Sequence, residues 1–102
     1  MIERAAIMKD SGTLEAASEI GQKDIVKALL QREPNINSQG ALIKASAGGF
    51  KDIVQMLLEN KADVDAKDSY GKVALHWAAD NGQETVMQLL LERGAKVVPA
   101  IH

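Results

Sequence analysis

The sequence contains no cysteine and very few aromatic residues, and both shortages restrict what the protein can be. Without cysteine there is no disulfide framework, no thiol nucleophile and no cysteine-based zinc site. Phe50, Tyr70 and Trp77 are the only aromatic residues, so we expect a core of leucine, isoleucine, valine, alanine and methionine. The absence of cysteine also fits a reducing compartment.

Excess basic charge and long apolar runs are missing as well. Twelve Lys and Arg residues face 14 Asp and Glu residues, for a net charge of -2. This balance argues against nucleic acid as the main partner, because phosphate contacts require clustered cations. No stretch is apolar enough to cross a bilayer, and charges interrupt the N-terminus before a secretory signal develops. We expect a soluble intracellular protein of the cytoplasm or nucleus, with no membrane partner.

What the chain does contain is an internal repeat within a length of 102 residues that suits one domain. The motif Lys-Asp-Ile-Val begins at Lys23 and returns at Lys51. A second spacing, of 33 positions, relates Leu42 to Leu75 and Gly49 to Gly82. Regular periods of about this length indicate stacked supersecondary units.

Each repeat reads as a helix, a glycine turn, a second helix and an extended loop. The expected helix pairs are 14–19 with 24–32, 42–47 with 52–60, and 73–80 with 84–93. The single domain divides into a leader helix (1–12), repeat one (13–37), repeat two (38–66) and repeat three with the tail (67–102). We expect residues 2–9 to form a short helix over repeat one, which has the polar character of a cap.

The end of the second helix differs between repeats two and three. Gly94 can take the positive φ that such an end requires, whereas Lys61 occupies the equivalent position in repeat two. A residue other than glycine costs roughly 1 kcal/mol in the left-handed conformation. We therefore expect the repeat-two helix to close on Asn60 instead.

The two connections between repeats also differ in length. Residues 65–74 are long enough for a projecting finger, and Asp68 with Gly71 suits the first and last positions of a type I turn. Between repeats one and two, residues 37–41 leave five residues fewer. This first connection is expected to turn directly, without a projecting tip.

Residues 71–82 read G-K-V-A-L-H-W-A-A-D-N-G, and residues 91–97 read L-E-R-G-A-K-V. They resemble the ankyrin repeat, whose signature is G-x-T-P-L-H-x-A-A-x-x-G with a second helix ending in L-L-L-x-x-G-A-x-V. Repeat three departs only where Val-Ala replaces Thr-Pro, while repeats two and one carry Ile43 and Glu15 at the histidine position. The resemblance covers about residues 13–98. It implies an all-α solenoid of about three helix–turn–helix repeats with one β-turn finger, and protein binding without catalysis or cofactor.

His76 and Asp80 are the one pair on which chemistry could be built, because they lie four apart on one helix. A metal site or an acid–base pair needs a third partner, and the sequence supplies none. No serine has a base spaced for a triad, and Gly48-Gly49 lacks the rest of a phosphate loop. We expect no enzyme activity and no metal, and the resemblance implies that His76 ties down neighbouring loops.

Two aromatic residues lead the candidates for partner binding. Trp77 either stands half exposed on the concave face or packs across the groove as core. Tyr70, at the finger tip, either anchors a partner or is a simple solvent-facing turn residue. Phe50 follows a turn glycine and is expected to be packed. The predicted partner-binding residues are Ser69, Tyr70, Lys72, Trp77, Asp80, Asn81 and Lys44.

The partner is expected to be another protein, and the main alternative is self-association. The second helix of repeat three and the tail (97–101) are apolar, as in an internal repeat that a neighbour covers. The chain would then be a fragment of a longer array, or would pair through repeat three with a second copy. An element swapped across the short connection at 37–41 is a further route to such pairing.

Overall fold

A computed structural model of the chain describes residues 2–97, with side chains from residue 11 onward. Residues 2–97 form six α-helices and no β-strand, which confirms the predicted all-α architecture. The helices are α1 (Ile2–Glu19), α2 (Lys23–Arg32), α3 (Gln39–Gly48), α4 (Lys51–Glu59), α5 (Ala74–Asp80) and α6 (Glu84–Glu92).

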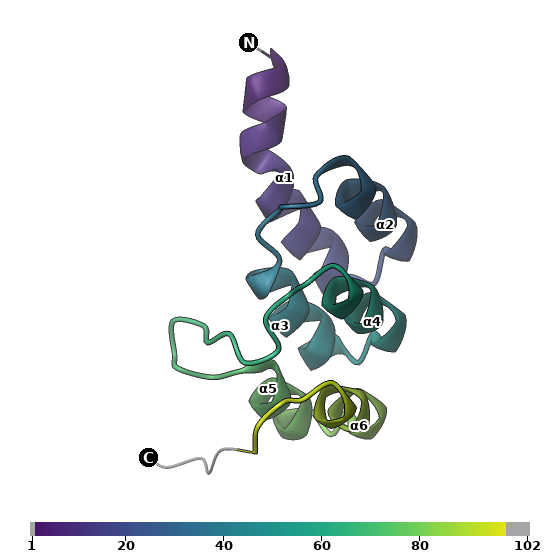
Figure 1. The fold of residues 1–102 in the computed structure, drawn as a ribbon, viewed down its shortest axis with the longest axis vertical. Coiled ribbons are helices and arrows are strands. Elements are labelled where there is room, and N and C mark those ends of the chain that lie inside the picture. Colours follow the sequence, from purple (N-terminus) through teal and green to yellow (C-terminus); the bar gives the residue numbers. More distant parts are fainter. Residues whose placement is uncertain (1, 98–102) are drawn as a thin grey trace.

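The helices stack in two rows. In one row α3 lies between α1 and α5, and in the other α4 lies between α2 and α6 (Figure 1). Each helix also packs against its partner in the same repeat. The stack is elongated, at 46 × 25 × 21 Å, because each repeat adds to the long axis.

The core between the rows is aliphatic, as expected from the shortage of aromatic residues. Its largest fully buried side chains are Leu14, Val26, Leu42, Ile53, Val54, Leu57, Val86 and Leu90. Full burial of one such side chain contributes about 1.5–3 kcal/mol. The stack is therefore stabilised chiefly by apolar contacts between consecutive repeats.

In repeats two and three, the residue after the glycine turn packs back onto the turn of the preceding repeat. The ring of Phe50 lies so close to Gly21 and Gly48 that a Cβ at either position would come within 2.6 Å of it. At the equivalent place in repeat three, the side-chain amide of Gln83 donates a hydrogen bond to the Ala47 carbonyl at 3.1 Å. Phe50 is packed, as predicted, and these two residues link consecutive repeats at the turn.

The N-terminal segment differs from its prediction. The leader was expected to be a separate short helix over repeat one, but residues 2–19 form one continuous helix that extends beyond the rest of the stack (Figure 1). This segment contains no proline, and Gly12 costs only about 1 kcal/mol within a helix. Among the described residues beyond its immediate chain neighbours and local helix backbone, none lies within 4 Å of a Cβ built at Gly12, so their packing does not force a break there.

The prediction for the end of α4 was right about the capping residue, Asn60, but wrong about Lys61. The helix has Asn60 as its C-cap residue, but Lys61 follows with a φ of 72°. Lys61 is the only residue other than glycine with positive φ within residues 2–97. The backbone N–H of Ala62 donates to the Leu57 carbonyl at 3.0 Å. The hydrogen bond that this geometry completes offsets the strain of the left-handed conformation.

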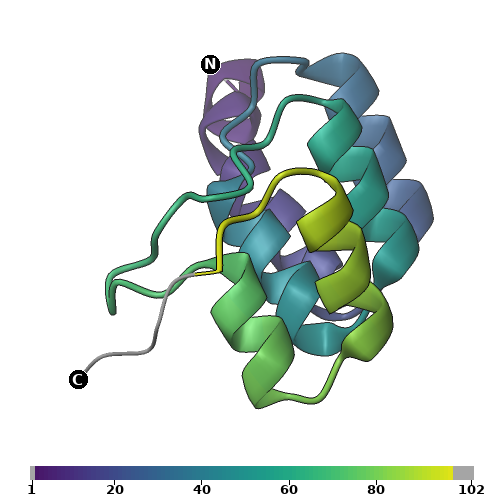
Figure 2. The same cartoon turned by 60° about the horizontal axis from the view of Figure 1, so that its bottom comes forward.

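The two connections follow their predictions. The chain between α4 and α5 projects from the stack as a finger, whereas the connection between α2 and α3 stays against the helices (Figure 2). Where the finger is absent, α3 starts at Gln39, three residues before the predicted Leu42. The Asn37 carboxamide oxygen accepts the backbone N–H of Gln39 at 3.1 Å, which helps to start the helix early.

Candidate binding groove

The finger is closed by a tight turn centred on Ser69 and Tyr70. The backbone N–H of Gly71 donates to the Asp68 carbonyl at 3.0 Å, and the N–H of Asp68 donates to the Lys72 carbonyl at 2.9 Å. Gly71 has a φ of 76°, so the turn ends in the left-handed residue typical of three-residue hairpins. The predicted turn between Asp68 and Gly71 is confirmed, and it leaves Tyr70 81% exposed.

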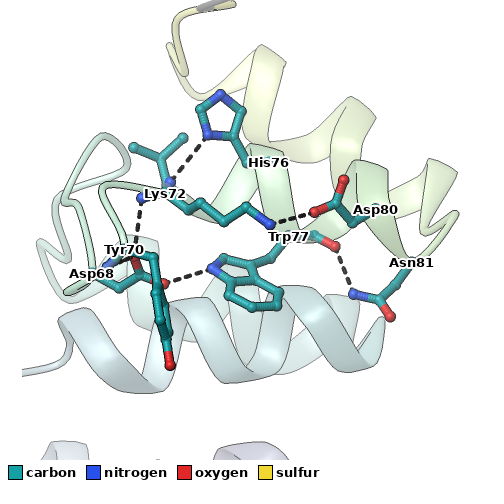
Figure 3. A network of polar contacts seen from close by, with 8 residues as sticks. Asp68, Tyr70, Lys72, His76, Trp77, Asp80 and Asn81 are labelled. Carbon is teal, nitrogen blue, oxygen red and sulfur yellow. Dashed lines mark hydrogen bonds and ion pairs between the residues drawn. The ribbon is translucent and has the colours of Figure 1, made fainter. Parts of the chain in front are cut away.

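The carboxylate of Asp68 holds the finger together and anchors it to α5. One oxygen accepts the backbone N–H groups of Tyr70 and Lys72, both at 2.9 Å. The other accepts the indole N–H of Trp77 at 2.7 Å (Figure 3). These bonds join the tip of the finger to the first helix of repeat three.

The pKa of Asp68 reflects this arrangement. Partial desolvation acts to raise the pKa, but it is outweighed by the hydrogen bonds from Lys72 N–H, the Trp77 indole and Tyr70 N–H, together with the charge of Lys72. The net effect lowers the pKa below its usual value. Each of these donors favours the ionised carboxylate.

Lys72 and Asp80 add a second, weaker contact over the same tryptophan. The Lys72 ammonium lies 4.4 Å from the centroid of the Trp77 ring and 2.7 Å from an Asp80 carboxylate oxygen. The side chains are 39% and 55% exposed, so their ion pair contributes about 0–1 kcal/mol. We therefore attribute the placement of the finger mainly to Asp68 and Trp77, with Lys72 covering one side of the indole.

A groove of about 490 Å³ opens between the finger and the first helices of the three repeats. Its lining residues are Glu15 and Glu19 of α1, Gly40, Ile43, Lys44, Ala47 and Gly48 of α3, Asp68, Ser69 and Tyr70 of the finger, and Trp77 of α5. The groove is hollow because three of the α3 residues are glycine or alanine, while larger side chains stand on both sides. Its volume lies within the range of about 300–1,000 Å³ typical of ligand sites.

The predicted partner-binding residues fall into two groups. Those that line the groove are Ser69, Tyr70, Lys44 and Trp77. The remaining three, Lys72, Asp80 and Asn81, surround Trp77 without lining the groove, and the Asn81 amide donates to the Trp77 carbonyl at 2.8 Å. Both descriptions of Trp77 hold in part, because its half-buried ring packs against the core and also lines the groove.

Three charged groove residues were missed by sequence reasoning. Asp68 was assigned only to the turn, and Glu15 and Glu19 were read as part of a polar cap. A Cβ built at Gly40 would clash with the Glu15 carboxylate, so this side chain folds across the start of α3. The i, i+4 spacing of Glu15 and Glu19 placed them on one face of a helix, but nothing in the sequence indicated what that face meets.

His76 and Asp80 do not act as a pair. Nδ1 of His76 accepts the backbone N–H of Val73 at 3.5 Å, which ties the end of the finger to α5 as the resemblance implied. The Asp80 carboxylate turns instead to Lys72. Within the described residues, no three histidine, aspartate or glutamate side chains gather as metal ligands would, and no helix is long and apolar enough to span a membrane.

Comparisons with known proteins agree with this architecture. The family of ankyrin repeats, in three copies, matches residues 14–100. A chain from the solved structure of the predatory endopeptidase Bd0816 of Bdellovibrio bacteriovorus in complex with immunity protein Bd3460 is 33% identical, with a TM-score of 0.75. The match covers 82% of the present chain and 47% of the other, so the match spans about half the length of that chain. No curated protein sequence matches.

Proposed function

Because the chain belongs to the ankyrin repeat family, whose repeats generally mediate protein–protein interaction and are typically non-enzymatic, we propose that it binds a protein partner through the groove beside its finger. The observation that carries the proposal is the rigid tip, where Asp68 fixes the turn to Trp77 while Tyr70 remains 81% exposed. A tip that is already ordered loses little conformational freedom on binding.

The groove supplies the rest of the proposed interface. Tyr70 and Trp77 offer the aromatic surface that is enriched at binding hot spots, and Lys44 and Ser69 add polar contacts beside them. Lys72 covers one side of the Trp77 ring, Asp80 pairs with Lys72, and Asn81 donates to the Trp77 carbonyl. The similar chain comes from a two-protein complex, which supports a binding role, and the absence of cysteine supports an intracellular, cytoplasmic location.

Capture from a cell extract tests the proposal. The immobilised wild-type chain is compared with Tyr70→Ala/Lys44→Ala, in which the groove loses two exposed side chains, and with Lys27→Ala/Gln31→Ala on α2 as the matched control. We expect proteins retained by the wild type and the control to be lost from the groove variant. Equal retention by all three would contradict binding at this groove.

Self-association is a second candidate, favoured by apolar exposure in repeat three. Leu91 is 43% exposed and Val97 is 76% exposed, whereas Leu58, the equivalent of Leu91 in repeat two, packs against the core. A second copy could cover this face, either directly or by swapping an element across the short connection at 37–41. Light scattering over a range of concentrations tests it, and a strict monomer at the highest concentration would rule it out.

A further inference from the structure

The two sides of the groove differ in chemistry, and this difference indicates what kind of segment fits it. On the finger side stand Tyr70 and Trp77, and on the α1 side stand Glu15 and Glu19, which are one helical turn apart. Ile43 and Ala47 of α3 lie between them as an apolar floor.

No described residue forms an ion pair with the carboxylates on the α1 side. Among the described side chains, the ion pairs are Lys23–Asp52, Lys72–Asp80 and Arg93–Glu59, and none includes Glu15 or Glu19. Lys44 is the one cation that lines the groove, and it has no ion pair within that part of the chain either. Two carboxylates and one ammonium leave an excess of negative charge there.

The carboxylate on the finger side is already occupied. Asp68 accepts two backbone N–H groups and the indole of Trp77, so it has little capacity left for a ligand. Lys72 covers one side of the same indole. In Figure 3 the side chain of Tyr70 runs past the Asp68–Trp77 bond, away from Lys72, and so leaves aromatic surface on the groove side.

We propose that the groove receives an extended segment of a partner protein that carries arginine for Glu15 and Glu19, and an apolar side chain for the floor beside Trp77 and Tyr70. This inference rests on the proposed function and adds the charge and chemistry of the partner. Arginine suits the α1 side because its planar guanidinium binds carboxylates with two parallel hydrogen bonds. Such bonds to charged groups are stronger than neutral ones.

The absent first finger makes room for such a segment. A finger between repeats one and two would project close to the start of α3, where Glu15 now lies across Gly40. With that connection shortened, the groove extends from the existing finger to α1. The partner segment would occupy this open stretch and cross three helices rather than one.

Trp77 gives a direct readout, since it is the only tryptophan and lines the groove. The probes are two eight-residue synthetic peptides, one of alternating leucine and arginine and one with glutamate in place of arginine. We expect the arginine peptide to change Trp77 fluorescence with a saturable curve, to bind more weakly as salt rises, and to outcompete the glutamate peptide. A lack of any saturable change with the arginine peptide would overturn the inference.

Two variants of equal net charge separate local from overall electrostatics. Glu15→Gln/Glu19→Gln is expected to weaken binding of the arginine peptide about tenfold, while Glu84→Gln/Glu92→Gln, on α6, keeps wild-type affinity. Far-UV circular dichroism shows whether both variants fold. Equal weakening by both variants, or tighter binding of the glutamate peptide, would overturn the inference. Tighter binding of the glutamate peptide would contradict the arginine preference but would still show that the groove binds peptides. Equal retention in the capture experiment would contradict the proposed function as well.

Discussion

Repeats two and three share one scaffold, yet only repeat three begins with a finger. Their helices are related by a shift of 33 residues, which makes Lys44 equivalent to Trp77, Ser46 to Ala79 and Lys61 to Gly94. In repeat three the residues before the helix form the finger. In repeat two the equivalent residues, Gln39 and Gly40, belong to the helix, so α3 begins two residues earlier than α5. The comparison shows that the core accommodates a repeat that begins with either a longer helix or a finger. The finger depends on its own polar contacts.

The largest effect on stability is expected when Trp77 is replaced by lysine, the residue at the equivalent position in repeat two. Trp77→Lys removes an aromatic side chain that packs against the core and the donor that anchors Asp68. We expect the free energy of unfolding to fall by about 2–3 kcal/mol, less than the roughly 3–5 kcal/mol typical for loss of a large buried aromatic side chain, because Trp77 is only half-buried. Urea unfolding followed by circular dichroism measures it.

Lys44→Ala is the matched control at the equivalent position. Its side chain is exposed and has no ion pair among the described residues, so we expect a change within about 0.5 kcal/mol. Similar losses for both variants would show that Trp77 has no special structural role.

Acid should release the finger by protonating Asp68, a residue that has no equivalent in repeat two. The pKa of Asp68 is lower in the folded protein than its ordinary value of 3.8. Its contribution to stability is therefore complete above pH 3.8 and is lost as the pH falls through the lower, folded-state value. We expect Trp77 fluorescence to change in this acid range.

Asp68→Asn is the control for that titration, since it keeps the shape of the side chain without its charge. We expect the acid change in fluorescence to disappear in this variant, and the N–H groups of Tyr70 and Lys72 to exchange several-fold faster at neutral pH. An unchanged acid titration would assign the effect to another carboxylate.

A smaller effect is expected when Ser46 is replaced by alanine, the residue at the equivalent position in repeat three. The hydroxyls of Ser18 and Ser46 are fully buried and have no hydrogen-bond partner among the described residues. Because an unsatisfied buried hydroxyl is unfavourable, Ser46→Ala should raise the free energy of unfolding by about 1 kcal/mol. Thermal unfolding tests it, with the exposed Ala79→Ser as the reverse exchange, for which we expect a change below about 0.5 kcal/mol. Destabilisation by Ser46→Ala would indicate a hidden partner for the hydroxyl.

The smallest effect concerns Lys61, whose left-handed conformation was not predicted. Lys61→Gly relieves the left-handed strain at a φ of 72°, but glycine also increases the entropy of the unfolded chain. The two terms oppose each other, so we expect a net gain of about 0.5 kcal/mol. Denaturant midpoints of Lys61→Gly and of the reverse exchange, Gly94→Lys, measure it. A loss of stability in Lys61→Gly would mean that the lysine side chain makes a compensating contact.

Much of the fold was predictable because its signals are local or periodic. The repeat spacing identified the helix pairs, and the Asp68–Gly71 pair identified the turn of the finger. The errors arose where two local preferences competed. Lys61 disfavours a left-handed conformation, but the hydrogen bonds that end α4 prevailed. Gly12 weakens a helix, but not enough to break one that has no competing packing.

The candidate site was predictable only in part. The exposure of Tyr70 followed from its place in the turn, and the register placed Lys44 and Trp77 at equivalent positions on the first helices. The bond from Trp77 to Asp68 was not predictable, because it depends on how the finger folds back onto α5. Glu15 and Glu19 were missed because their groove partners lie on two other helices and the finger.

The sequence by itself determined which residues are equivalent, which faces are buried and where the chain turns, since these follow from residue-by-residue preferences repeated at a fixed period. Only the tertiary structure decided that the small residues of α3 lie between the carboxylates of α1 and the aromatic residues of repeat three. That juxtaposition depends on how consecutive repeats stack and on the absence of a finger between repeats one and two. Both are properties of packing between repeats, and no single repeat encodes them.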